Sequence, residues 1–289
     1  MMKSLVMVLA LALPAAAGEG IPVLIVDGQN NHNYKAMTPF MKAQLEKTGM
    51  FRVDVSTTPP RAPGGPKKGV EETAEQKAKR DVETAAVRQA WGAWRPDFTK
   101  YKVVVSNYNG ELWPEEVRKG FETFVANGGG VHIVHAANNA FPEWKEYNLM
   151  IGLGWRDNKY GRRLIYNDAG ESVVVEAGKG PGAGHGPQHE FVMQLRDSEH
   201  PIIKGLPKTW KHTADELYHG QRGPAENMKV LATAYSSKEK GGTGDHEPML
   251  WVIPAGKGQV VTNVMGHENG KALQCVSFVT LMNRSVEWL

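Results

Sequence analysis

Four short apolar runs, rich in β-branched residues, set the strongest limit on the fold of this 289-residue chain. They lie at 21–26, 103–105, 131–134 and 259–264. Continuous apolar runs of this kind are typical of strands buried on both faces, as in a parallel sheet. The sequence therefore predicts a central sheet that is mostly parallel.

Segments with helical periodicity alternate with these strands. Residues 114–127 begin with a proline and two acids, end at an Asn-Gly pair, and repeat their apolar side chains at helical spacing. Residues 38–48 and 273–286 are the other helices that we expect. Alternation of strands and helices predicts an α/β protein with a doubly wound sheet in three flavodoxin-like layers.

Two segments interrupt this alternation, and we expect both to be insertions or lids on a single domain that spans 21–289. The first, 57–95, holds a loop rich in proline, glycine and basic residues, followed by a solvent-facing helix at 71–91. The second, 152–222, is rich in glycine and histidine and is expected to lie over the edge of the sheet.

The N-terminus has the pattern of a signal peptide. Lys3 precedes an apolar run at 5–13, and small residues follow at Ala15–Ala17. We therefore expect residues 1–17 to be cleaved and the protein to be periplasmic or secreted. The apolar run is too short to span a bilayer, so no membrane span is predicted. A buried N-terminal strand is the alternative.

The net charge and the cysteine content limit which binding partners and covalent links are expected. The net charge is only +3 and basic residues are spread along the chain, which argues against nucleic-acid binding. The single cysteine, Cys275, excludes an internal disulfide, and the apolar stretch around it predicts a buried residue without a role in catalysis. Formation of a homo-oligomer is left open.

Unusual polar residues follow each of the four predicted strands. Ligands of open α/β sheets bind beyond the carboxyl ends of the strands, so we expect these loops to converge on one crevice. The candidates are His135 and His267 as catalytic residues and, for substrate binding, Asn31, His32, Asn107, Asn109, Asn138, Asn139 and Glu268.

Further histidines and acids lie between the strands. Asp215 and Glu216 stand in a stretch with two histidines and are candidate catalytic acids or bases. His185 and His189 have the spacing of two metal ligands on one helix face, but the glycines and proline around them favour a loop. We keep this pair as the tentative site of a divalent metal, the one cofactor considered. His132 lies within an apolar strand and is expected to be a buried sheet residue.

The order and spacing of several motifs resemble the ThuA-like (trehalose-utilisation) family over essentially the whole mature chain. The fold of that family resembles that of class I glutamine amidotransferases. The matching segments are 27–32, 124–131 with His135-Ala136, 200–207, 215–218, 248–251, 256–260 and Gly266-His267.

The resemblance has consequences for function. Glutamine amidotransferases carry a cysteine on a sharp turn after a central strand; here that turn corresponds to His135-Ala136-Ala137, which has no nucleophile. Membership of the family would imply use of trehalose or related sugars through 3-keto intermediates. A small sugar would then be cleaved by histidine-based or metal-assisted chemistry, with Trp113, Trp144 or Trp155 stacking on it or packing in the core. The alternative is a non-catalytic carbohydrate-binding module.

Overall fold

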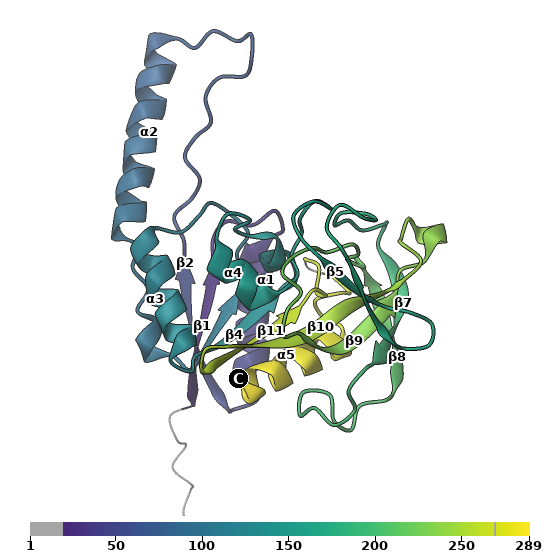
Figure 1. The fold of residues 1–289 in the computed structure, drawn as a ribbon. Helices are drawn as coiled ribbons and strands as arrows, with labels where there is room; N and C mark the ends of the chain where they lie inside the picture. Colours follow the sequence, from purple (N-terminus) through teal and green to yellow (C-terminus); the bar gives the residue numbers. More distant parts are fainter. Residues whose placement is uncertain (1–19, 269) are drawn as a thin grey trace, which may run out of the picture.

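A mixed sheet forms the centre of the computed structural model, which describes residues 20–268 and 270–289 (Figure 1). Its strand order is β2-β1-β3-β4-β11-β10-β9-β7-β8, and β5 and β6 extend it from β10. The strands are β1 (Ile21–Asp27), β2 (Phe51–Thr57), β3 (Val103–Ser106), β4 (Gly130–Val134), β5 (Arg163–Tyr166), β6 (Ser172–Val175), β7 (His189–Leu195), β8 (Thr209–Asp215), β9 (Lys229–Tyr235), β10 (His246–Ala255) and β11 (Gly258–Asn263).

The four strands predicted from apolar runs are neighbours. β1 pairs with β3, β3 with β4 and β4 with β11, in each case in parallel. Their carboxyl ends therefore lie along one edge, and the predicted α/β class with a parallel sheet is confirmed. β2, which no apolar run predicted, pairs in parallel with β1 at the border of the sheet. Most side chains of β2 are at least partly exposed, so the strand lacks a continuous apolar run.

The remaining strands continue the sheet in antiparallel fashion. β10 pairs with β11 and β9, and β7 pairs with β9 and β8. The segment 152–222, expected to lie over the sheet edge, instead supplies β5, β6, β7 and β8 to the sheet itself. Within the antiparallel part, Arg163 of β5 and Glu247 of β10 form an ion pair in which both side chains are almost completely buried.

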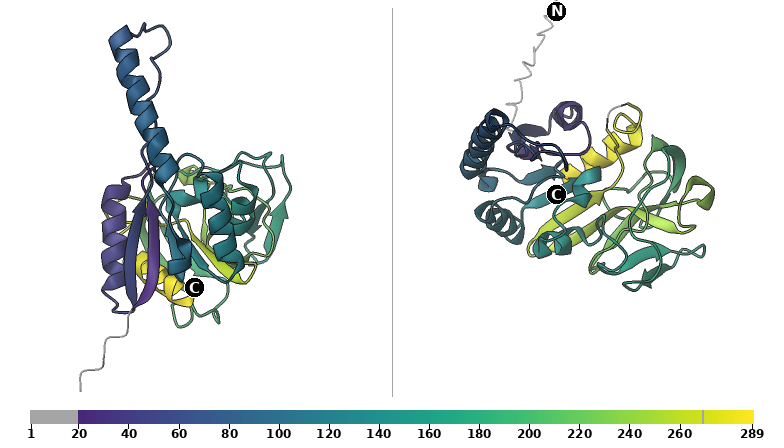
Figure 2. Two further views of the ribbon diagram at one scale, coloured as in Figure 1. Left: turned by 90° about the vertical axis from the view of Figure 1, so that its left-hand side faces the viewer. Right: turned by 90° about the horizontal axis from the view of Figure 1, so that it is seen from above.

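Helices cover both faces of the sheet (Figure 2). α1 (Tyr34–Glu46) and α5 (Val276–Trp288) pack together on one face, over one of two hydrophobic cores. α3 (Glu115–Ala126) and α4 (Lys145–Ile151) pack on the other face, over the second core. The three helices predicted at 38–48, 114–127 and 273–286 are confirmed, although α1 begins earlier and α5 later than expected.

The helix α2 (Ala74–Ala93) projects away from the body of the molecule (Figure 1). None of its residues is buried, which confirms the solvent-facing helix expected at 71–91. Its first turn is stabilised by a capping box, in which Thr73 and Gln76 exchange hydrogen bonds. At its base, Trp91 and the following Trp94 pack against the second core.

His132 and Cys275 were both predicted to be buried, and they differ in the structure. His132 is fully buried, as predicted. Cys275 is not a fully buried residue: it is partly exposed and occupies the position just before the first residue of α5 instead of lying within that helix. The apolar spacing was correct for the helix, but the helix begins one residue after the cysteine.

In the described ranges, no helix is long and apolar enough to cross a membrane. The expected signal peptide at residues 1–17 lies outside the described residues.

Candidate functional site

The turn after β4 places His135 at the centre of the strand-end edge. His135 has a φ of 45°, an uncommon backbone conformation for a residue with a side chain, and it opens the short 3₁₀ helix His135–Asn139. The fully buried ring lies 2.8 Å from the carbonyl oxygen of Val264 through Nδ1. Because a carbonyl only accepts hydrogen bonds, Nδ1 carries the proton, and in the neutral ring Nε2 keeps its lone pair.

Three further residues meet His135 and form the four-residue cluster His32, His135, Glu216 and His267. One potential ligand atom from each lies within 4.8 Å of the others. Glu216 Oε1 is 3.2 Å from His267 Nε2, and Glu216 Oε2 is 3.6 Å from His135 Nε2. The His32 ring centroid lies 4.7 Å from that of His135 and 4.6 Å from that of His267.

The cluster residues come from separate parts of the fold. His32 follows β1, His135 follows β4 and His267 follows β11, so these three share the edge formed by parallel strands. Glu216 directly follows β8, which lies at the far border of the antiparallel part. The chain must curve back over the sheet edge after β8 to bring this carboxylate to the histidines.

The electrostatic environment keeps the His32 imidazole neutral and the Glu216 carboxylate ionised within the cluster. Burial, with His135 and His267 nearby, lowers the pKa of His32 to about 4, so this imidazole is neutral near pH 7. Burial acts to raise the pKa of Glu216, but the His135 and His267 side chains beside the carboxylate outweigh it and hold this pKa well below its usual range. The result is a neutral imidazole beside a carboxylate that remains ionised, the states in which both bind metals.

Asp215 lies next to the cluster and holds the backbone that carries His267. Its fully buried carboxylate accepts hydrogen bonds from the backbone amides of Gly266 at 2.8 Å and His267 at 3.2 Å. Gly266 has a φ of 95°, and a Cβ there would come within 2.3 Å of the Phe278 ring. A glycine is therefore needed at this turn, and Asp215 fixes the backbone that carries His267. Asp215, predicted to be catalytic, lies one layer behind the cluster.

An aromatic and imidazole rim borders the four-residue cluster. His185 lies 3.5 Å from Glu216 Oε1 through Nε2, and its Nδ1 lies 2.6 Å from the carbonyl oxygen of Gly186. The Tyr218 hydroxyl is 3.3 Å from His135 Nε2, and the Trp155 ring packs edge-on against Tyr218. Tyr218 was not among the predicted site residues, although it belongs to the same motif as Glu216.

Three predicted substrate-binding residues lie beside the cluster. Asn31 Nδ2 is 3.1 Å from His32 Nε2, and Asn109 Nδ2 donates to Asn31 Oδ1 at 2.7 Å. Glu268 lies 3.9 Å from His32 Nδ1 and accepts a hydrogen bond from the backbone of Asn33. These groups remain partly accessible and can contact a ligand at the cluster.

Two of the other predicted asparagines, Asn107 and Asn138, hold the scaffold together. Asn107 is fully buried and donates to Thr38 Oγ1 at 3.0 Å, and Asn138 is fully buried and donates to the carbonyl of Leu153 at 2.5 Å. For Asn139, the backbone carbonyl accepts a hydrogen bond from Arg156 at 2.8 Å, and the side chain lies beside Tyr218 of the rim. Of the three tryptophans considered for sugar stacking, Trp113 and Trp144 are buried in the second core, whereas Trp155 reaches the rim.

The structure does not place His185 and His189 together at the cluster. His189 begins β7, and its Nδ1 lies 2.8 Å from the carbonyl oxygen of Pro187. Within the described ranges, the group of potential ligands that converges is His32, His135, Glu216 and His267, and neither residue of the predicted pair belongs to it. The i, i+4 spacing would place both histidines on one face only in a helix, and here the segment is a loop followed by a strand.

The cluster fits a divalent transition metal. Three imidazole nitrogens and one carboxylate oxygen are donors that zinc and similar ions accept, at about 2.0–2.2 Å from the ion. Atoms that already lie within 4.8 Å of one another need only small movements to reach such an ion. The hydrogen bond from His135 Nδ1 to Val264 directs Nε2 to the cluster, as second-shell partners of ligating histidines do.

A mixed sheet with a parallel part flanked by helices, and a sharp turn after β4 that carries a histidine, define an α/β protein with a glutamine amidotransferase-like fold. The sequence model of a family described as trehalose utilisation (ThuA) matches residues 65–289. The chain belongs to this family.

Comparison with solved structures agrees with this family and fold. A ThuA-like protein from Parabacteroides merdae shares 37% sequence identity with a TM-score of 0.80, over 93% of this chain and 90% of that one. A ThuA-like protein from Bacteroides uniformis has 17% identity and a TM-score of 0.56, over 94% of each chain, which shows the shared fold alone. A search of curated proteins found no match.

Proposed function

We propose that this protein is an exported enzyme of carbohydrate utilisation that holds a divalent metal at the four-residue cluster and cleaves a glycoside there. The observation that carries the proposal is the convergence of three imidazoles and one carboxylate from four separate segments. They meet at the strand-end edge, where open α/β sheets bind ligands. Membership of the trehalose utilisation family supports a sugar as the substrate.

The substrate that suits this site best is a glycoside with a keto group at C3. The carbonyl makes the neighbouring C2 proton acidic, and removal of this proton places negative charge on the carbonyl oxygen. A divalent cation held by the cluster would stabilise that oxygen. Partly exposed amides of Asn31 and Asn109 lie beside the cluster and can hydrogen-bond the sugar hydroxyls.

His185 is positioned to act as the base. Its Nδ1 donates to the carbonyl of Gly186, so Nε2 of the neutral ring is unprotonated and faces Glu216 at the mouth of the cluster. Nε2 takes the C2 proton, the C1–C2 double bond forms, and the C1–O bond breaks. The departing oxygen takes the proton back from His185 and leaves as an alcohol. The reaction is an elimination and consumes no water.

Turnover of sugars tests this proposal. The protein is incubated with 3-keto-trehalose and with trehalose, each with and without EDTA, and released glucose is measured. We expect glucose from the keto sugar, at least about a tenfold lower rate with the chelator, and recovery on adding Zn²⁺ or Mn²⁺. Sugar binding without turnover would support a non-catalytic binding module. Absence of both turnover and binding would remove carbohydrates from the proposal.

Two variants of the same segment provide a matched comparison for that assay. His185→Gln should lower turnover by about 10²- to 10⁴-fold, the usual contribution of a general base. His189→Gln should stay within a few-fold of the original rate, because His189 contacts Pro187 and not the cluster. Equal effects of the two changes would contradict the assignment of His185.

Export is tested separately. The basic residue, apolar run and small residues at 3–17 motivate cleavage close to Ala17. N-terminal sequencing of protein recovered from the native cell envelope should therefore give a first residue near Gly18. A mature protein that retains Met1 would show that this part of the proposal is wrong.

A further inference from the structure

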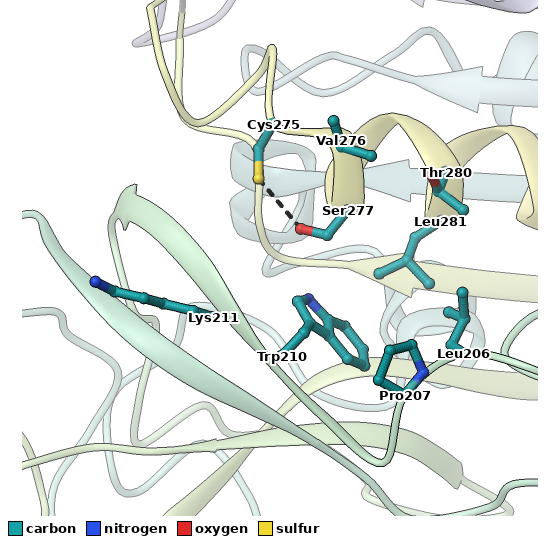
Figure 3. A pocket seen from close by; sticks show the side chains of 9 residues that line it. All are labelled: Leu206, Pro207, Trp210, Lys211, Cys275, Val276, Ser277, Thr280 and Leu281. Carbon is teal, nitrogen blue, oxygen red and sulfur yellow. Dashed lines mark hydrogen bonds between the residues drawn. The ribbon is translucent and has the colours of Figure 1, made fainter.

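An apolar cavity of about 290 Å³ lies between β8 and the N-terminal half of α5, outside the four-residue cluster (Figure 3). Its walls include the apolar side chains of Leu206, Pro207, Trp210, Val276 and Leu281. Cys275 and Ser277 stand at one end of it. Apolar pockets with a few polar groups at one end are the usual form of small-molecule sites.

A hydrogen-bonded chain connects this cavity to a buried acid. The thiol of Cys275 lies 3.2 Å from Ser277 Oγ, and Ser277 Oγ lies 2.9 Å from His212 Nδ1. The other ring nitrogen, Nε2, lies 2.9 Å from Asp215 Oδ2. His212 and Asp215 are both fully buried, whereas Cys275 is partly exposed. A thiol, an imidazole and a carboxylate in this order have the arrangement of an activated nucleophile with its base and orienting group.

The charges along this hydrogen-bonded chain favour the thiolate form of Cys275. Hydrogen bonding from His212 lowers the pKa of Cys275 to about 6, with smaller contributions from Ser277 and Thr213. Burial alone would lower the pKa of His212, but Asp215 and Cys275 outweigh it and raise this pKa to about 9. The thiol also stands at the N-terminus of α5, where free backbone amides stabilise negative charge.

The cavity also contains a donor without an acceptor. Nε1 of Trp210 is covered and has no hydrogen-bond partner among the described residues. Figure 3 shows this nitrogen on the edge of the indole ring turned toward α5. Buried N–H groups are nearly always paired, so this unpaired donor on a ring at the cavity wall is a feature that an oxygen acceptor of a ligand would satisfy after a small shift of the ring. A carbonyl oxygen bound near the thiol meets this requirement.

We propose that Cys275, His212 and Asp215 form a second reactive centre, at which the Cys275 sulfur accepts an apolar acyl group from an ester or thioester bound in this cavity. The sulfur attacks the carbonyl carbon and forms a C–S bond. The bond from that carbon to the leaving oxygen or sulfur breaks with its electron pair, and the leaving group takes a proton from the His212 imidazolium. The products are S-acylated Cys275 and an alcohol or thiol. This centre differs from the turn at His135, which has no nucleophile.

The experiment uses the full-length protein with 4-nitrophenyl hexanoate and 4-nitrophenyl acetate at pH 7. We expect a burst of 4-nitrophenolate close to one equivalent of protein and a hexanoyl mass increase that peptide mapping places on Cys275. Because each buried methylene adds to binding, hexanoate should react at least about tenfold faster than acetate. A label on Lys211 or Ser277, no burst, or equal rates for both esters would overturn the proposal.

Two variants separate this centre from nonspecific acylation and from the proposed sugar chemistry. Cys275→Ala removes only the partly exposed thiol and should abolish the burst while leaving 3-keto-trehalose turnover within a few-fold. Ser277→Ala removes the hydroxyl between thiol and imidazole and should retain the burst at a reduced rate. A full burst in Cys275→Ala would contradict the proposal, whatever the outcome of the sugar assay.

Discussion

Replacement of Glu216 by glutamine is expected to remove the metal and at least about 10² of the turnover rate. Glu216 is the anion of the four-residue cluster and contacts both His135 and His267. Glutamine keeps the shape of the side chain but supplies a neutral oxygen, which binds transition metals weakly. Metal content, measured by mass spectrometry after dialysis against Zn²⁺, should fall from about one ion per chain to background.

Glu268→Gln is the matched control for that change. Glu268 also faces His32, but its carboxylate is 3.9 Å from Nδ1 and lies outside the group of converging ligand atoms. Metal content should therefore stay close to one ion per chain, with turnover within about tenfold of the original if Glu268 binds only the sugar. Equal metal binding by Glu216→Gln and the original protein would show that the cluster is not the metal site.

Replacement of Trp113 by alanine is expected to give the largest loss of stability, about 3–5 kcal/mol. Trp113 is only 2% exposed, and its ring lies between 5.3 and 6.3 Å, centroid to centroid, from six other aromatic rings. Alanine would leave a cavity among these rings, and the rings cannot all move inward to fill it. The measurement is the urea midpoint of unfolding, interpreted at an unchanged m value.

Trp91→Ala controls for the loss of an indole ring as such. Trp91 lies at the base of the projecting helix α2 and is only partly buried. Its removal should cost about 1 kcal/mol or less, because water can fill the space it leaves. A similar cost for Trp113 and Trp91 would mean that the aromatic cluster does not contribute to stability as its packing indicates.

The parallel part of the fold was predictable because its strands are buried on both faces. Such strands carry continuous apolar runs, and runs at 21–26, 103–105, 131–134 and 259–264 became adjacent strands. Most residues of the antiparallel strands β7 and β8 are exposed or only partly buried, so these strands lack continuous apolar runs and their contribution to the sheet was not apparent. β2 was missed for the same reason.

The candidate site was predictable to the extent that it follows from parallel strands. His32, His135 and His267 were named because each follows a strand of that group, and the structure brings them together. The sequence also marked Glu216, but its place beside them depends on the path of the chain after β8, which no local pattern reveals. Asn107 and Asn138 show the opposite case, because asparagine in turns often bonds to the local backbone and here both point inward.

The projecting arm around α2 offers a practical opening for engineering. Because none of the helix residues is buried and the contact of Trp91 with the second core lies at the base, the outer turns of the arm can be shortened, labelled or exchanged without removing side chains from either core. Along the chain, the arm is inserted between β2 and β3. Both strands lie toward the opposite border of the sheet from β7 and β8. A fluorophore or a fused domain carried on the outer turns of α2 would therefore give a handle for immobilisation or distance measurement while the sheet and the four-residue cluster stay intact.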